Sequence, residues 1–175
     1  KHASVPVING LTDKGHPCQV MADIMTLEER AGAIEGKCVA WVGDTNNVAQ
    51  SWIEAAAKFR FTLRLAAPEG YRPAPEAIGR ARKAGAAIEI VPNAAAAVAG
   101  ADVVSTDAWV SMTHQDREAR LKAFAPYQVN EALMAKAPGA VFLHCLPAHR
   151  GEEVTDGVLD GAQSLAWDEA ENRLH

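Results

Sequence analysis

Asp107 and Ser111 have side chains whose type and position could serve chemistry. Asp107 directly follows the apolar run 103–106, and a carboxylate there can accept a hydrogen bond from an ammonium group or orient an amine for attack. Ser111 follows shortly after and adds a small hydrogen-bond donor. A solvated loop with a local aspartate turn is an equally good interpretation of the position alone.

Cys145 follows another apolar run, 141–144, and could be a nucleophile, a metal ligand or a small apolar filler. The filler role is the commonest one for a free cysteine, and a nucleophilic thiol needs a base and a lowered pKa. We expect His144 to face the opposite side of the strand from Cys145, because successive side chains alternate. His144 is therefore a poor base for the thiol.

A third candidate lies where a helix is predicted to begin, at His16 and Gln19 on either side of Pro17. Helix N-termini gather free N–H groups and partial positive charge, and histidine and glutamine donors beside them suit a polarised carbonyl oxygen. A capping turn is the alternative. A zinc site made by His16 and Cys18 is disfavoured, because no second pair with ligand spacing follows.

The polar turn Gly43–Asn47 follows the apolar run 38–42. It lacks the Gly-x-Gly-x-x-Gly pattern whose glycines let the backbone reach a pyrophosphate, so a dinucleotide cofactor is disfavoured. Asn46 or Asn47 could cap the following helix, or could hold the carboxylate or amine of a ligand.

Apolar runs of strand length alternate with helical patterns along the chain. The strands are expected at 38–42, 62–66, 87–91, 103–106 and 141–144, and the helices at 17–31, 48–59, 75–84, 94–99, 116–124, 130–136 and 155–159. Further strands are expected at 5–11 and 164–167, before a last helix that begins at 168 or 169. This order predicts an α/β fold, a three-layer, Rossmann-like open parallel sheet in a single domain. Such sheets bind ligands outside the carboxyl ends of their strands, where the candidate loops would meet.

Composition narrows the class of protein. The 175 residues are 49% hydrophobic with a net charge of −5, which disfavours disorder and a nucleic-acid partner. No stretch has the length of a membrane span. The three cysteines fit no disulfide scaffold and no paired zinc motif, which favours reduced thiols and a cytoplasmic location. The first residues lack the apolar run of a signal peptide, and both ends read as cuts within a longer chain.

Taken together and in order, these segments resemble the carbamoyltransferase family, and within it the ornithine branch. Residues 16–19 match its His-Pro-x-Gln motif, 43–47 its Gly-Asp…Asn-Asn turn and 107–112 its Asp-x-Trp-x-Ser-Met-Gly loop. Residues 144–147, His-Cys-Leu-Pro, are the most specific match, and 168–173 match the segment that leads into the family's last helix.

The resemblance implies transfer of a carbamoyl group from carbamoyl phosphate to the side-chain amine of L-ornithine, giving L-citrulline in amino-acid biosynthesis toward arginine. His16 and Gln19 would hold the carbamoyl group, and Arg173 would reach its oxygen. Cys145 and Leu146 would lie beside the amine and the carbamoyl carbon, with Asp107 on the amine and both Asp107 and Cys145 catalytic. The residues implied to hold ornithine are Asn47, Asp107, Ser111 and Met112.

The resemblance also implies that no metal or organic cofactor is needed, since phosphate is a good leaving group and binding supplies orientation. Residues 1–175 would form the carboxy-terminal, ornithine-binding half. The amino-terminal carbamoyl-phosphate domain is missing, so the chain alone is expected to be inactive, and full-length relatives are expected to be homotrimers. Thr113 stands where the family has glycine, which puts normal closure of that loop in doubt.

Two other functions remain open at this stage. The same fold could serve as a non-catalytic amino-acid-binding fragment, or as a carbamoyltransferase for another amine such as putrescine or an acylated ornithine. The Asp107 loop, with Ser111 and Met112, favours free ornithine.

Overall fold

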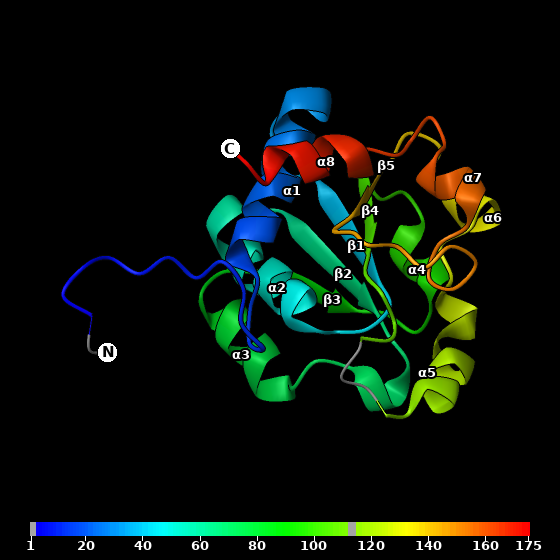
Figure 1. Cartoon of the computed structure of the whole chain (residues 1–175), viewed down its shortest axis with the longest axis horizontal. Helices are drawn as coiled ribbons and strands as arrows, with labels where there is room; N and C mark the ends of the chain where they lie inside the picture. Colours follow the sequence, from blue (N-terminus) through cyan, green and yellow to red (C-terminus); the bar gives the residue numbers. More distant parts are fainter. Residues whose placement is uncertain (1–2, 112–114) are drawn as a thin grey trace.

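A five-stranded parallel sheet forms the centre of the computed structural model, which describes residues 3–111 and 115–175 (Figure 1). The strand order is β3-β2-β1-β4-β5. The strands are β1 Cys38–Val42, β2 Thr62–Ala66, β3 Ala87–Ile90, β4 Val103–Thr106 and β5 Val141–His144. The fold is therefore the three-layer open α/β sheet that the alternating pattern predicts.

Helices cover both faces of the sheet. On one face lie α1 Pro17–Ala31, α2 Asn47–Phe59 and α3 Pro75–Lys83, and on the other α4 Ala94–Val98, α6 Glu131–Met134 and α7 Asp156–Leu159. The remaining helices are α5 Arg117–Phe124, α8 Ala166–Asn172 and the 3₁₀ turns η1 Glu69–Tyr71 and η2 Ala125–Tyr127. Helix α8 packs on α1, so the last part of the described chain lies beside the first helix (Figure 1).

The sheet separates two apolar cores, and the alternation of β1 shows how. Val39 and Trp41 point into the core beneath α1, α2 and α3, whereas Ala40 and Val42 point into the core beneath α4, α6 and α7. Both faces are covered, so the strand must be apolar at every position. This is why β1 reads as one continuous apolar run.

Two predicted strands are wrong. Residues 5–11 form no strand, and the apolar side chains of Val5, Val7, Ile8 and Leu11 are exposed on an extended segment. Ser164 makes only an isolated bridge to Phe142, after which the chain enters α8 at Ala166. One pair of backbone bonds, Phe142 N to Gln163 O and Leu165 N to Phe142 O, accounts for all the strand character of that segment.

The centre of the sheet creates a crevice at its carboxyl edge. Strands β1 and β4 are neighbours, but the chain leaves β1 toward β2 on one side and leaves β4 toward β5 on the other. The loops after β1 and β4 therefore diverge, and a topological switch point of this kind is where open sheets bind ligands.

Membrane spans were sought among the helices of residues 3–111 and 115–175. None of these helices combines the length and the apolar character that crossing a bilayer requires.

Trp52 tests how much the first core contributes to stability. It is 0% exposed on α2, with its ring 5.5 Å from that of Phe61 in an edge-on arrangement. We expect Trp52→Ala to lower the free energy of unfolding by about 3–5 kcal/mol, because it leaves a cavity. Trp167→Ala, at a side chain that is 55% exposed, should change it by less than about 0.5 kcal/mol. Urea unfolding followed by circular dichroism measures both, and equal losses would contradict the assigned core.

Candidate functional site

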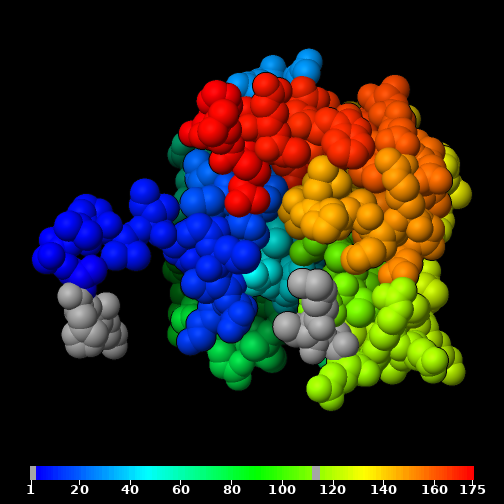
Figure 2. Space-filling model, viewed as in Figure 1, coloured from blue at the N-terminus to red at the C-terminus, as the bar shows by residue number. Residues whose placement is uncertain are grey.

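A cavity of about 800 Å³ opens at the carboxyl edge of the sheet, over the switch point between β1 and β4. In the space-filling view the cyan segment after β1 lies deep between the blue segment before α1 and the gold loop after β5 (Figure 2). The residues that line the cavity come from the segment before α1 and from the loops after β1 and β4. They are Leu11, Thr12, Asp13, Asp44, Asn46, Asn47, Asp107, Ala108 and Ser111.

Asp107 and Cys145 meet at this edge. A carboxylate oxygen of Asp107, the sulfur of Cys145 and a ring nitrogen of His144 all lie within 4.8 Å of one another. Burial raises the pKa of the Cys145 thiol well above its ordinary value, and the charge and hydrogen bond of Asp107 raise it further. The thiol is therefore protonated at neutral pH and bonds to the carboxylate, so it lacks the thiolate that a nucleophile needs.

Asn46 orients the Asp107 carboxylate from the other side. The amide oxygen of Asn46 caps α2 by accepting from the backbone N–H groups of Val48 and Ala49, at 3.0 and 3.2 Å. This leaves its Nδ2 to donate to Oδ2 of Asp107 at 2.5 Å, while the Ala108 N–H donates to Oδ1 at 2.7 Å. One asparagine therefore both starts a helix and fixes the direction of the carboxylate.

His144 and Cys145 pack toward opposite faces, as the alternation predicts: Cys145 packs with Leu143 against the first core, and the His144 ring centre lies 6.3 Å from that of Phe142 in the second core. A ring nitrogen of His144 nevertheless lies within 4.8 Å of the Cys145 sulfur. The strand ends at His144, and Leu146 adopts a left-handed φ of 49°. The Leu146 N–H donates to Nδ1 of His144 at 3.0 Å, and Nε2 lies 3.3 Å from Oε1 of Glu153. Both ring nitrogens are thus engaged, and His144 is the tautomer with its proton on Nε2.

Glu153 is a buried carboxylate that these contacts keep charged. Burial raises its pKa, but the hydrogen bonds from His144 and from the backbone of His149 outweigh this and hold the pKa below its ordinary value. It belongs to the loop after β5, and its Oε1 contacts Nε2 of the His144 ring.

Gln19 lies at the centre of a buried network between α1 and α8. Its side-chain amide donates to Oδ1 of Asp23 and to Oε1 of Glu169, each at 2.7 Å. Its Oε1 accepts from Nη1 of Arg173 at 2.5 Å. Both amide hydrogens are used, so Gln19 can offer a ligand only a further lone pair of its oxygen.

Asp23 and Glu169 also hydrogen bond to each other, which requires a proton between the two carboxyl groups. Burial raises the pKa of Asp23 to about 6. Burial, together with the charge of Asp23, raises the pKa of Glu169 well above its ordinary value. Glu169 Oε2 accepts in addition from the backbone N–H of His144 at 2.8 Å, so the network reaches the end of β5.

His16 presents a neutral imidazole at the start of α1. Its backbone N–H donates to Oγ of Ser51 at 2.7 Å, which joins α1 to α2. Burial lowers the pKa of the ring, and the charge of Arg173 lowers it further. The Nδ1 atom is buried, and no hydrogen-bond partner for it occurs among the described residues.

Arg120 connects the two loops of the switch point, which follow β1 and β4. Its Nη2 pairs with the carboxylate of Asp44 in the loop after β1, and its Nε donates to the Trp109 carbonyl in the loop after β4 at 2.6 Å. The guanidinium lies 4.8 Å from the centre of the Tyr71 ring and 5.2 Å from that of Phe124. A buried cation with this many partners holds the loops that carry Asn46 and Asp107.

The remaining predicted site residues are placed as follows. Asn47 and Ser111 line the cavity, and the Nδ2 of Asn47 donates to the Thr12 carbonyl at 2.8 Å. Leu146 follows Cys145 at the turn after β5, and Met112 and Thr113 lie outside the described residues. The roles of all these residues in binding or catalysis stay predictions.

Sequence reasoning missed four residues of the site: Asn46 as a partner of Asp107, and Asp23, Glu169 and Arg120 altogether. Some signals were present. Asp23 is one helical turn after Gln19, and Arg120 is one turn before the buried Phe124. Glu169 lies within the matched segment 168–173, but its contact with Gln19 could not be predicted, because the two residues are 150 positions apart in the sequence.

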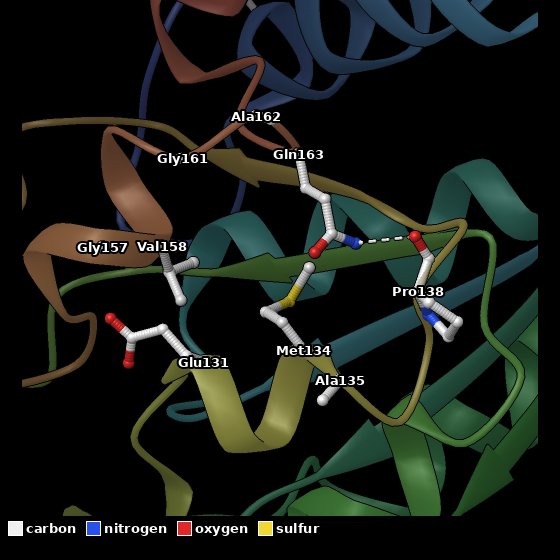
Figure 3. A pocket seen from close by; sticks show the side chains of 9 residues that line it. All are labelled: Glu131, Met134, Ala135, Pro138, Gly157, Val158, Gly161, Ala162 and Gln163. Atoms are coloured by element: carbon white, nitrogen blue, oxygen red, sulfur yellow. Dashed lines mark hydrogen bonds between the residues drawn. The ribbon is translucent and has the colours of Figure 1, made fainter.

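A smaller pocket, of about 300 Å³, lies between α6 and α7 (Figure 3). Gln163 points into it, but its amide already donates to the carbonyls of Ala137 and Ala140, at 3.1 and 2.7 Å. Met134 and Val158 make much of the rest apolar. This pocket contains no set of groups suited to catalysis.

The shared proton predicts an unusual dependence of stability on pH. A carboxyl group whose pKa is higher in the folded than in the unfolded chain stabilises the fold fully below its unfolded pKa and loses that contribution as the pH rises. For Asp23 the loss spans pH 3.8 to about 6. We expect Asp23→Asn to remove this decline, because an amide can accept from Gln19 and donate to Glu169 at any pH.

Urea unfolding at a series of pH values measures this as the difference in unfolding free energy between the original chain and the variant. The difference should fall as the pH rises through this range. If the unfolding free energies of the original chain and the variant change in parallel with pH, Asp23 does not titrate in this range.

Arg120 should contribute far more to stability than an exposed arginine. Arg120→Met leaves the Asp44 carboxylate without this guanidinium, and we expect a loss of about 3–5 kcal/mol. The control is Arg60→Met, which breaks an exposed pair with Glu35 and should cost less than about 1 kcal/mol. Thermal and urea unfolding compare the two, and similar losses would rule out the bracing role of Arg120.

Comparisons with known proteins fit this geometry. Residues 35–175 match the family model of the aspartate/ornithine carbamoyltransferase Asp/Orn binding domain, and residues 1–29 match that of the carbamoyl-P binding domain. The first match ends within α1, and the second begins between α1 and β1. Helix α1 nevertheless packs on α2 and α8 and so belongs to the same body as the sheet.

Individual relatives agree with the family models. The chain is 57% identical over its whole length to an ornithine carbamoyltransferase of Agrobacterium fabrum and covers 58% of that protein. It superposes on the solved ornithine carbamoyltransferase of Pyrococcus furiosus with a TM-score of 0.92 and 49% identity, covering 99% of this chain and 57% of the other. For that of Burkholderia thailandensis the TM-score is 0.88 and the identity 48%, with 99% and 56% covered.

The chain thus spans a little over half the length of the curated relatives it matches. These matches confirm the family that the sequence motifs indicate. The chain belongs to the aspartate/ornithine carbamoyltransferase family.

Proposed function

We propose that this chain supplies the ornithine-binding half of an ornithine carbamoyltransferase, which transfers the carbamoyl group of carbamoyl phosphate to the side-chain amine of L-ornithine. The products are L-citrulline and phosphate. The observation that carries the proposal is the meeting of the Asp107 carboxylate and the protonated Cys145 thiol beside a cavity at the switch point. An anionic carboxylate next to a neutral thiol suits an amine, because the amine is a cation when it is protonated and a nucleophile once it has lost that proton.

The cavity fits a diamino acid in size and charge. Its volume of about 800 Å³ is ample for ornithine, and Asp107 provides a negative charge for the side-chain ammonium. Asn47 and Ser111 line the same cavity with neutral polar groups, which suit the α-amino and α-carboxylate groups. We place the side-chain nitrogen of ornithine at Asp107 and Cys145, and its amino-acid end toward Asn47 and Ser111.

In the transfer step, the amine nitrogen forms a bond to the carbamoyl carbon and the bond from that carbon to the phosphate oxygen breaks. The ammonium must first lose a proton, and the Asp107–Cys145 pair is placed to take up the proton and the positive charge. Phosphate leaves with the electron pair of the broken bond. The step needs no change of oxidation state, and positioning supplies much of the rate enhancement.

The donors for the carbamoyl group lie at the start of α1. The guanidinium of Arg173 can donate to the oxyanion that forms as the amine attacks, and His16 can do so in the tautomer that carries its proton on the unpartnered Nδ1. The carbonyl oxygen of Gln19 has a lone pair left for the carbamoyl NH₂ group. Leu146, after the turn at Cys145, would cover the reacting carbon.

The phosphate must be held by residues outside this chain. We place the carbamoyl-phosphate-binding half against the groove of about 710 Å³ between α1 and α8, where Met21, Met25 and Leu174 are exposed. The chain alone is therefore proposed to bind ornithine without turnover. Trimeric assembly, a cytoplasmic location and a role in arginine biosynthesis belong to the same proposal and rest on the family.

Calorimetric titration of the chain with L-ornithine tests the proposed site. We expect Asp107→Asn to weaken binding by about 10- to 100-fold, because it removes a charged acceptor for the ammonium group. The control is Asp160→Asn, an exposed carboxylate paired with Arg150, which should leave binding unchanged. Putrescine, which lacks the amino-acid end, should bind more weakly than ornithine.

Catalysis is tested by mixing the chain with the carbamoyl-phosphate-binding half of a relative and measuring citrulline. Turnover should appear only in the mixture and should be lost with Asp107→Asn. If the folded chain binds ornithine but the mixture makes no citrulline, the non-catalytic binding role is favoured. Binding that ignores Asp107 would overturn the proposed site itself.

A further inference from the structure

The loop after β5 carries a second cluster of charged side chains, distinct from the cavity over the switch point. His149, Glu152 and Glu153 place a ring nitrogen and two carboxylate oxygens within 4.8 Å of one another. His149 is partly exposed, Glu152 is mostly buried, and the side chain of Glu153 is 0% exposed. The cluster is therefore open to solvent on the histidine side and closed on the glutamate side.

Two carboxylate oxygens of this cluster have no hydrogen-bond donor. Oε2 of Glu152 and Oε2 of Glu153 are both buried, and neither has a hydrogen-bond partner among residues 3–111 and 115–175. The other oxygen of each group is occupied: Oε1 of Glu153 accepts from the His149 N–H at 2.5 Å, and Oε1 of Glu152 pairs with Arg117. A buried carboxylate oxygen without a donor is costly, so a ligand that satisfies two of them at once is strongly favoured.

The spacing of the three groups suits a small divalent cation. Zinc binds histidine nitrogen and carboxylate oxygen at about 2.0–2.2 Å with tetrahedral geometry, which places neighbouring ligand atoms about 3.4 Å apart. Nδ1 of His149 lies 3.6 Å from Oε2 of Glu153. We propose that His149, Glu152 and Glu153 form a binding site for a zinc-class divalent cation, with a water molecule as the fourth ligand.

The charges around the cluster are compatible with a bound divalent cation. Arg117 neutralises one carboxylate through Oε1 of Glu152 and leaves its Oε2 without a hydrogen-bond partner among the described residues. Arg150, the other nearby cation in the sequence, is turned to Asp156 and Asp160, at 2.7 and 2.6 Å. Two carboxylates, one guanidinium and one divalent ion give a small net positive charge, which solvent on the histidine side can screen.

The cluster of Asp107, His144 and Cys145 is a weaker candidate for the same ion. Both ring nitrogens of His144 already have partners, and the Cys145 thiol is protonated. A metal there would have to displace one of these two partners of the His144 ring and remove the thiol proton. An ion bound through Oε2 of Glu152 and Oε2 of Glu153 leaves in place the contacts of their Oε1 atoms with Arg117 and the His149 N–H.

An ion at this site would stiffen the loop that carries Cys145 and Leu146. The ion would hold Oε2 of Glu153 to His149, while Oε1 of Glu153 stays near Nε2 of His144. Glu153 would therefore connect the ion to the His144 ring, which lies beside the Asp107–Cys145 pair. The proposal does not depend on carbamoyl transfer, since the ion is bound outside the cavity and takes part in no chemical step.

Zinc titration of the chain against a chromogenic chelator tests the site. We expect His149→Gln to weaken the tightest zinc site by at least about 10-fold. This variant should fold normally, because the His149 side chain is 43% exposed. Glu152→Gln should weaken the site as well. Cys145→Ser is the matched control and should bind zinc as the original chain does.

Cobalt(II) provides a second readout that identifies the ligands. At the proposed site its visible spectrum should contain no thiolate-to-cobalt charge-transfer band, and zinc should raise the melting temperature of the original chain but not of His149→Gln. No zinc binding, unchanged binding by His149→Gln, or loss of binding in Cys145→Ser with a thiolate band would each overturn the proposal.

Discussion

The hydrogen bond between the Asp107 carboxylate and the Cys145 thiol is the interaction on which the rest of the site depends. It joins the loops after two neighbouring strands, and it stays in place because Asn46 and the Ala108 N–H hold the carboxylate from the other side. Burial keeps the thiol protonated, so the pair offers an acceptor and a neutral donor in one place. That combination suits the positioning of an amine far better than attack by sulfur.

Two supports stabilise this arrangement, and both join segments far apart in the sequence. Arg120 ties the loops after β1 and β4 to α5, and the proton between Asp23 and Glu169 ties α8 to α1. The second support also fixes the amide of Gln19, whose carbonyl oxygen then faces Arg173. The charged groups of the site are thus ordered by buried contacts that would be costly to break singly.

The sequence predicts the strands of the sheet well, because each is a short apolar run that must be buried on both faces. It also predicts that Asp107 and Cys145 meet, since carboxyl ends of parallel strands share one edge. It fails where tertiary context decides. The role of Glu169 was missed because its partner Gln19 on α1 is remote in the sequence. The apolar segment 5–11 was misread as a strand, although it forms no strand in the structure.

A crystal structure of the chain with L-ornithine tests the central claim most directly. The account predicts the side-chain nitrogen within about 3 Å of a carboxylate oxygen of Asp107, on the side that faces the Cys145 sulfur. It also predicts the α-amino and α-carboxylate groups against Asn47 and Ser111. An ornithine bound with its α-amino group at Asp107, or bound away from the switch point, would contradict the account.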